Sequence, residues 1–324
     1  MGKKKTRGAY LICAVMLLSF ATMASAATER LLMGTSSAGA SYYILGSGLA
    51  KVLSDNVDDM EVSVEVTGGP TTNIQLIQQG DMELGLSTVW LAGDAYNGTG
   101  WTKGKKYQNF RTLCPLYSSI LYIYTLKDSG IKSVYDLEGK NVSVGAPGAT
   151  SELAGRAVLK VLGIKPKSIS SLPTSSQVNG LKDGLMDAVF AVSGVPASWL
   201  LDLETTHDVA FIPLEQKDMD KVLQEYPFWS KGSIPAGSYK NQGSDVPVFA
   251  FWNASIAAKN LSEKTAYNIV KTTFECLDQL IAVDPTAKQA SMDKIQHLTT
   301  PLHPGALKYY HEQGIEIPER LILK

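Results

Sequence analysis

Two long apolar stretches decide the fold that this sequence predicts. Residues Phe110 to Thr125 read FRTLCPLYSSILYIYT, and residues Val248 to Ala258 read VFAFWNASIAA. Both are rich in β-branched and aromatic residues and are longer than an ordinary strand, so each can leave one domain and enter another. We therefore expect two lobes that are joined by two crossing strands and separated by a cleft.

Shorter strand and helix patterns alternate on either side of the first long stretch. This alternation is typical of parallel sheets with helices on their faces. Strands are predicted at Leu31–Met33, Val62–Val66, Leu84–Leu86, Asn141–Val144, Ile169–Leu172 and Ala188–Val192. Helices are predicted at Tyr42–Leu53, Asn73–Gln79, Leu153–Leu162, Gln177–Lys182, Trp199–Leu203, Glu263–Ala282 and Ala306–Gln313, whereas Glu225–Pro247 reads as irregular chain.

The predicted class is α/β, with two parallel or mixed sheets, one in each lobe, flanked by helices and joined by hinge strands. The first lobe is expected to comprise residues 27–119 and 241–324, and the second lobe residues 120–240. One large doubly wound sheet is the alternative.

The first 26 residues have the three parts of a secretory signal. They read MGKKKTRGAYLICAVMLLSFATMASA, with basic residues first, an apolar run from Leu11 to Phe20, and small residues at the end. The run is too short to span a bilayer. We expect cleavage after Ala26 and export to the periplasm; an uncleaved N-terminal anchor is the alternative.

Composition and motifs exclude several classes of protein. The chain has 324 residues, of which 44% are hydrophobic and 19% charged, and its formal net charge is -1, so a large core is expected and a nucleic-acid partner is not. The sequence lacks HExxH, G-x-S-x-G and P-loop motifs, so we expect no enzymatic activity, no cofactor and no bound metal. Cys114 and Cys276 either form a disulfide or are buried free thiols.

Four loops of one kind each follow a predicted strand and precede a predicted helix. They are Ser36–Ser41, Gly68–Thr72, Gly145–Ser151 and Ser193–Ser198, and all are small and rich in hydroxyl groups. In a parallel sheet such loops lie at the carboxyl ends of the strands, where helix N-termini offer free N–H groups to an anion. The pattern predicts a site for a small carboxylate in the cleft, without Lys or Arg. The alternative for each loop is an ordinary helix cap.

Aromatic residues adjoin these loops. Tyr42 and Tyr43 open the first predicted helix, and Trp90 follows the third predicted strand. These rings could form walls of the site and select ligands by shape. Ordinary core packing is the alternative.

The chain also resembles the TAXI-type solute-binding receptors of TRAP (tripartite ATP-independent periplasmic) transporters. The resemblance spans about residues 31–314 and rests on short motifs in a fixed order. These are Gly34–Ser37 with Tyr42–Tyr43, Thr67–Gly69 with Asn73, Asp94–Gly98, Asp128–Ile131 with Asp136–Leu137, Gly139–Gly145, Pro147–Gly148 with Glu152, Tyr226–Phe228, Ile234–Gly237, and Leu302–Ala306.

The resemblance implies a type II periplasmic binding fold and a ligand such as glutamate, glutamine or 2-oxoglutarate. It further implies that the partner is an ion-gradient-driven TRAP permease in the membrane. We expect the receptor to be a monomer. A sensor subunit for a receptor kinase and an exported enzyme on the same fold are the alternative functions. The candidate ligand-binding residues are Ser36, Ser37, Tyr42, Gly69, Asn73, Thr88, Trp90, Gly148, Ala149, Thr150, Ser151, Ser193 and Pro196.

Overall fold

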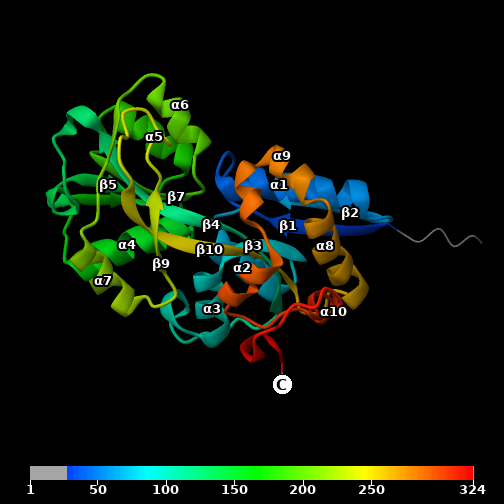
Figure 1. Cartoon of the computed structure of the whole chain (residues 1–324). Coiled ribbons are helices and arrows are strands. Elements are labelled where there is room, and N and C mark those ends of the chain that lie inside the picture. Colours follow the sequence, from blue (N-terminus) through cyan, green and yellow to red (C-terminus); the bar gives the residue numbers. More distant parts are fainter. Residues whose placement is uncertain (1–27, 324) are drawn as a thin grey trace, which may run out of the picture.

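A computed structural model describes residues 28–323, so the predicted signal segment and its cleavage site lie outside the described residues. The described chain forms one ten-stranded sheet flanked by helices (Figure 1). The strands are β1 (Glu29–Gly34), β2 (Met60–Glu65), β3 (Leu84–Thr88), β4 (Phe110–Leu126), β5 (Asn141–Ser143), β6 (Ser168–Ser170), β7 (Ala188–Ser193), β8 (Val209–Phe211), β9 (Ser230–Ile234) and β10 (Val246–Ala258).

Ten α-helices lie within the described part of the chain, together with short 3-10 turns. The α-helices are α1 (Ser41–Asn56), α2 (Pro70–Gln79), α3 (Val89–Asn97), α4 (Thr150–Leu162), α5 (Thr174–Lys182), α6 (Ser198–Glu204), α7 (Gln216–Glu225), α8 (Glu263–Glu275), α9 (Leu277–Val283) and α10 (Pro304–Glu312). The 3-10 turns are η1 (Gly100–Thr102), η2 (Lys127–Ser129), η3 (Val134–Leu137), η4 (Pro285–Gln289), η5 (Met292–His297) and η6 (Glu319–Leu321).

The sheet has two parallel wings on either side of an antiparallel pair. Its strand order is β2-β1-β3-β10-β4-β7-β5-β6, with β8 paired to β4 and β9 paired to β10. Within the wings, β1 runs parallel to β2 and β3, and β5 runs parallel to β6 and β7. The central strands β4 and β10 are antiparallel to each other. The long apolar stretches of the sequence are therefore the strands that both halves share.

The molecule is two-lobed, and each wing with its helices forms one lobe. Figure 1 shows α1, α2, α3, α8, α9 and α10 around the first wing, and α4, α5, α6 and α7 around the second. The expected two-lobed α/β fold is confirmed, and the two predicted sheets are the wings of one ten-stranded sheet. Since β4 and β10 are long enough to pair in both lobes, the hydrogen bonds continue through the middle. The exact lobe limits at residues 119 and 240 stay predictions.

The central pair is irregular where the two lobes meet. The β4–β10 register shifts between Trp252 and Ala254, opposite Pro115. Proline has no N–H to donate, so it breaks the ladder and favours such a bulge. The side chain of Asn253 compensates, because its Nδ2 donates to the carbonyl of Tyr117 at 2.8 Å. The irregularity thus places the Asn253 side chain and the Tyr117 carbonyl at the junction of the lobes.

Each lobe has its own hydrophobic core. In the first lobe, α1, α8 and α10 pack on the sheet through side chains such as Leu45, Leu49, Ile269 and Tyr310. In the second lobe, α4 and α7 pack on β5 and β7 through a separate cluster that includes Val158 and Phe190. Two cores on one sheet give rigid bodies that can hold a site between them.

Several elements differ from the sequence prediction. Residues 225–247, which were predicted to be irregular, contain strand β9. Its sequence SKGSI lacks the alternation of apolar and polar residues that marks a strand, and β9 is short, half-exposed and paired with β10. The helix predicted at Glu263–Ala282 is two helices, because Cys276 leaves the helical conformation at ψ 25°. Strand β8 and helix α7 were not predicted.

The two described cysteines are both free thiols. Cys114 is buried, and its Sγ lies 3.1 Å from the Ser255 hydroxyl, whereas Cys276 is half-buried between α8 and α9. The disulfide alternative is therefore wrong for this structure. Burial of both thiols is correct for Cys114 and only partly so for Cys276.

Candidate functional site

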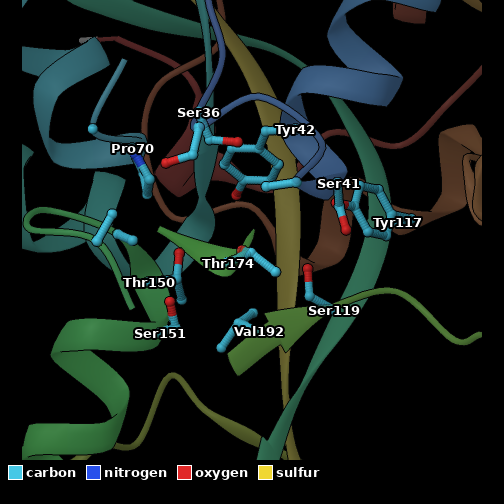
Figure 2. Close-up of a pocket in the computed structure, with 15 residues that line it drawn as sticks. Ser36, Ser41, Tyr42, Pro70, Tyr117, Ser119, Thr150, Ser151, Thr174 and Val192 are labelled. Atoms are coloured by element: carbon cyan, nitrogen blue, oxygen red, sulfur yellow. The ribbon is translucent and has the colours of Figure 1, made fainter. Parts of the chain in front are cut away.

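A cavity of about 60 Å³ lies where the two lobes meet. Figure 2 shows Ser36, Tyr42 and Pro70 on one side of it and Thr150, Ser151 and Val192 on the other. The lining is contributed by the starts of α1, α2, α4 and α5 and by the middle of β4 and the end of β7. The complete lining is Ser36, Ser37, Ala40, Ser41, Tyr42, Gly68, Pro70, Tyr117, Ser119, Ala146, Ala149, Thr150, Ser151, Thr174 and Val192.

Four helix N-termini face this cavity without a side-chain cap. The N-cap residues of α1, α2, α4 and α5 are Ala40, Gly69, Ala149 and Pro173, and within the described chain none of them caps its helix through a side chain. By contrast, α3 and α8 are capped by Thr88 and Ser262. The N–H groups of an uncapped first turn need another acceptor. Helices α6 and α7 also lack a side-chain cap. What distinguishes α1, α2, α4 and α5 is that their first turns line one cavity.

Two buried hydroxyl groups at the cavity lack partners. Neither Ser36 Oγ nor the Tyr117 hydroxyl has a hydrogen-bond partner among the described residues, and Tyr117 is fully buried. Buried polar atoms are normally paired, so an unpaired one in a cavity wall needs an explanation. A ligand atom would pair both groups. The two side chains come from different places, since Ser36 follows β1 and Tyr117 lies in the crossing strand β4.

Other hydroxyl groups around the cavity are already engaged. The Tyr42 hydroxyl donates to Asn253 Oδ1 at 2.5 Å, and Asn253 Nδ2 contacts Ser119 Oγ at 2.5 Å. Ser41 Oγ lies 2.6 Å from Ser193 Oγ across the two lobes. These bonds fix the orientation of the wall before a ligand binds.

The site is electrostatically positive although no charged side chain of the described residues lines it. Each helix N-terminus carries about half a positive charge. The nearby Glu152 is already compensated, since it accepts from the Gly148 N–H, from Arg156 and from Ser171. Burial raises the pKa of both Tyr42 and Tyr117 well above the ordinary tyrosine value, so both stay neutral. The wall offers donors to one anion.

At the rim of the cleft the backbones of the two lobes come so close together that Gly68 and Gly148 leave no room for a side chain. Thr71 Oγ1 at the start of α2 donates to the Gly148 carbonyl in the other lobe at 3.0 Å. A Cβ at Gly148 would lie 2.6 Å from Thr71 Oγ1, and one at Gly68 would lie 2.8 Å from the Pro147 carbonyl oxygen. Gly148 also has φ +82°, which disfavours other residues. These glycines let the backbones of the two lobes touch each other.

The structure brings six of the predicted site residues together in the cavity wall. They are Ser36, Ser37, Tyr42, Ala149, Thr150 and Ser151. Gly69 and Gly148 lie at the rim, where the backbones of the lobes meet. The grouping supports the prediction that loops of both lobes form one site, while ligand contact by these residues stays a prediction.

Two predicted residues, Asn73 and Thr88, lie outside the cavity wall and have structural roles. The fully buried Asn73 donates to the carbonyls of Gly34, Thr35 and Leu86 at 3.1, 2.9 and 2.9 Å and so holds β1 to β3. Thr88 caps α3. The structure therefore does not bring these residues into the cavity wall, and their polar atoms already have partners.

Trp90 also lies outside the cavity wall, in an aromatic cluster of the core. Its ring lies 4.9 Å from Trp229, 5.8 Å from Tyr226 and 6.0 Å from Phe251, measured between centroids. Trp90 is 5% exposed and does not line the cavity. The packing alternative for this residue is the correct one.

The fourth predicted loop lines a neighbouring cavity of about 190 Å³. Ser193 and Pro196 face this space together with Ser41, Trp199 and Asp284. The Ser41–Ser193 hydrogen bond connects the walls of the two cavities. Ser193 thus adjoins the first cavity, whereas Pro196 lies away from it.

Sequence reasoning missed some of the lining. Thr174 follows β6 in the same strand–loop–helix pattern, with hydroxyl residues Ser175 and Ser176 after it, so that signal was available. Ser41 ended a quoted loop but was not proposed. Tyr117 and Ser119 lie inside a long apolar stretch, where nothing in the pattern separates a cavity residue from a core residue.

The structure offers no sign of a metal centre in residues 28–323, where no group of three or more His, Cys, Asp or Glu side chains could hold an ion. Within the same range, none of the helices combines the length and the apolar character that a bilayer span requires.

Comparison with known proteins gives a family and a fold. The model of the NMT1-like family matches residues 33–314, and the chain therefore belongs to this family. The structure is similar to MatC from Rhodopseudomonas palustris with bound malate, with 12% identity, a TM-score of 0.57, and coverage of 88% of this chain and 96% of MatC.

Two further solved structures are similar. The periplasmic binding protein BugD has 14% identity and a TM-score of 0.54, with 90% of this chain and 99% of BugD covered. The arginine-, lysine-, histidine-binding protein ArtJ from Geobacillus stearothermophilus has 15% identity and a TM-score of 0.50, with 83% and 100% covered. At these identities the likeness shows the fold, which is the two-lobed fold of periplasmic binding proteins.

Proposed function

We propose that this member of the NMT1-like family is a periplasmic solute-binding receptor. It captures a small carboxylate-bearing solute in the cavity between the lobes and delivers it to a membrane permease. One observation carries the proposal: four helix N-termini without side-chain caps converge on one buried cavity from both lobes. This arrangement binds a small anion without a basic side chain.

The contacts across the cleft suggest how binding is coupled to closure. Helices α1 and α2 belong to one lobe and α4 and α5 to the other, so an anion between them bonds to both. Such a ligand binds the closed form more tightly than the open form, and this difference shifts the equilibrium toward closure. The motion is a hinge in β4 and β10, near the bulge at Asn253.

The permease and the ligand class follow from the motifs named above. The resemblance to TAXI receptors makes a TRAP permease the proposed partner, and glutamate, glutamine and 2-oxoglutarate the first ligands to test. The similar fold of malate-bound MatC supports a carboxylate. A Kd near 1 μM corresponds to about 8 kcal/mol, which several charge-assisted hydrogen bonds and buried contacts can provide.

Binding rather than turnover suits the wall of the cavity. The lining from the described chain contains no His, Cys, Asp, Glu or Lys, so no strong general base or activated nucleophile faces a bound solute. Prolonged incubation with a bound ligand should return it unchanged. Its conversion would favour the enzyme alternative.

A ligand screen with a blocked variant tests the proposal. Organic acids and amino acids should raise the melting temperature of the mature protein in a thermal-shift screen. The double variant Ser36→Leu/Ser151→Leu fills the cavity and should abolish this effect while the protein still melts cooperatively. Retained affinity in that variant would place the site elsewhere. Ser54→Leu, in α1 and outside the cavity wall, is the control.

A further inference from the structure

Tyr117 lines the cavity but belongs to none of the loops that form most of its wall. It belongs to β4, the crossing strand, and its side chain lines the cavity beside Ser41 (Figure 2). The residue is fully buried, yet its hydroxyl has no partner among the described residues. A phenol that is buried and unpaired costs free energy unless something else occupies the space beside it.

Two tyrosines of the same strand serve as comparisons. The Tyr122 hydroxyl is paired with the Gly194 carbonyl at 2.8 Å and with Tyr239 at 2.7 Å. The Tyr124 hydroxyl is buried and, among the described residues, also unpaired, but Tyr124 does not line this cavity. An unpaired hydroxyl alone therefore indicates nothing about a ligand. Tyr117 differs because it lines the cavity between the lobes.

Two backbone acceptors near the cavity are already used, and no carboxylate of the described residues lines the wall. Asn253 uses the carbonyl of Tyr117, and Thr71 uses the carbonyl of Gly148. A ligand ammonium group needs acceptors and is repelled by helix N-termini. Carboxylate, carbonyl and hydroxyl oxygens instead suit the uncapped N–H groups, Ser36 Oγ and the Tyr117 hydroxyl.

The cavity also limits size and charge. Its volume of about 60 Å³ admits on the order of five water-sized groups. Among the described residues, no Lys or Arg lines the wall to balance a second carboxylate. A small ligand with one carboxylate fits better than a dicarboxylate.

We propose that Tyr117 is a ligand-recognition residue and that its cavity selects small monocarboxylates with an oxygen, rather than an ammonium group, on the carbon next to the carboxylate. This inference rests on the proposed function and narrows it. The Tyr117 hydroxyl and Ser36 Oγ bind the polar head of the solute, while Val192 and Ala146 contact its short apolar part.

One rival reading involves Asp284, which is buried in the neighbouring cavity beyond the Ser41–Ser193 bond. Its Oδ1 accepts hydrogen bonds from the Thr286 N–H and hydroxyl, and its negative charge contributes to raising the pKa of Tyr117. A ligand ammonium group that reached Asp284 would reverse the selectivity. The choice of probes distinguishes these two readings.

Isothermal titration of the mature protein with lactate, pyruvate and alanine makes the first test. These molecules have the same number of non-hydrogen atoms and differ in the group at the second carbon. Lactate or pyruvate should bind at least about 10-fold more tightly than alanine and than succinate, glutamate or 2-oxoglutarate. Tighter binding of alanine, glutamate or a dicarboxylate overturns the inference but leaves the proposed function intact. If no carboxylate in the wider screen binds, both fail.

The second test is Tyr117→Phe, with Tyr124→Phe as the matched control. Loss of a hydrogen bond to a charged or polar head should weaken binding about 10- to 100-fold in Tyr117→Phe. The melting temperature without ligand should stay the same or rise, because an unpaired buried hydroxyl is removed. Tyr124→Phe should show the same thermal behaviour with unchanged affinity. Wild-type affinity in Tyr117→Phe overturns the role of Tyr117.

Discussion

The wall around Tyr117 and the cluster around Trp90 are both buried, both rich in aromatic rings and both next to the crossing strands. In the Trp90 cluster, the rings of Tyr226, Trp229 and Phe251 fill the space completely around the indole. In the Tyr117 wall, a hydroxyl and four helix ends surround a space that the described side chains leave open. Aromatic residues beside a cleft therefore do not identify a site; unpaired polar atoms around a cavity do.

The largest effect is expected from Trp90→Ala. Removing a buried indole should lower the free energy of unfolding by about 3–5 kcal/mol, because Trp90 contacts three other rings. Ligand affinity of the folded fraction should not change. Chemical denaturation and calorimetric titration measure the two quantities. Trp90→Phe should cost less, and altered ligand selectivity in either variant would mean that the cluster belongs to the site.

Asn73→Ala tests the residue that supports the loops without lining the cavity. Three carbonyls lose the donor that Asn73 shares among them, and we expect a loss of about 2–3 kcal/mol in the free energy of unfolding. Affinity should fall only modestly, since the loop ends would shift. Asn56→Ala, at an exposed position near the end of α1, is the control and should change stability little. A pure affinity loss at full stability would place Asn73 in contact with the ligand.

Gly148→Ala probes the contact between the lobes. The left-handed backbone should cost about 1–2 kcal/mol of stability, and the new Cβ would press against Thr71 Oγ1. The variant should therefore close less readily and bind about 10-fold more weakly. Gly130→Ala also has a positive φ but meets nothing within 4 Å, so it should lose stability alone. If Gly148→Ala and Gly130→Ala bound the ligand with equal affinity, the Gly148–Thr71 contact would have no role in closure.

The smallest effect is expected from pH. Burial raises the pKa of Tyr42 and Tyr117 in the folded state, so both remain protonated throughout pH 5–8. Their contribution to stability is constant below the ordinary tyrosine pKa of about 10 and is lost only above it. The Kd for a carboxylate should accordingly stay constant between pH 5 and pH 8. A change of more than about threefold in Kd between pH 5 and pH 8 would show that a side chain that titrates in this range contacts the ligand.

Much of the fold was predictable because it depends on local patterns. Short apolar runs followed by Gly- and Ser-rich loops predicted the parallel wings, and the two long stretches predicted the crossing strands β4 and β10. Strand β9 was missed because its SKGSI sequence has no apolar alternation, and it is a strand only through pairing with β10. The break at Cys276 was missed because helical periodicity continues across it.

The sequence by itself determined that loops from both parts of the chain lie at the carboxyl ends of strands, and ten residues of those loops do line one cavity. Only the tertiary structure decided which buried polar side chains lack a hydrogen-bond partner among the described residues. Tyr117 and Tyr124 lie in the same apolar strand and both have unpaired hydroxyls, yet of the two only Tyr117 lines the cavity between the lobes. The reason is that periodicity reports which face of an element is buried, whereas an enclosed space and an unpaired hydroxyl depend on how two lobes meet across long sequence separations.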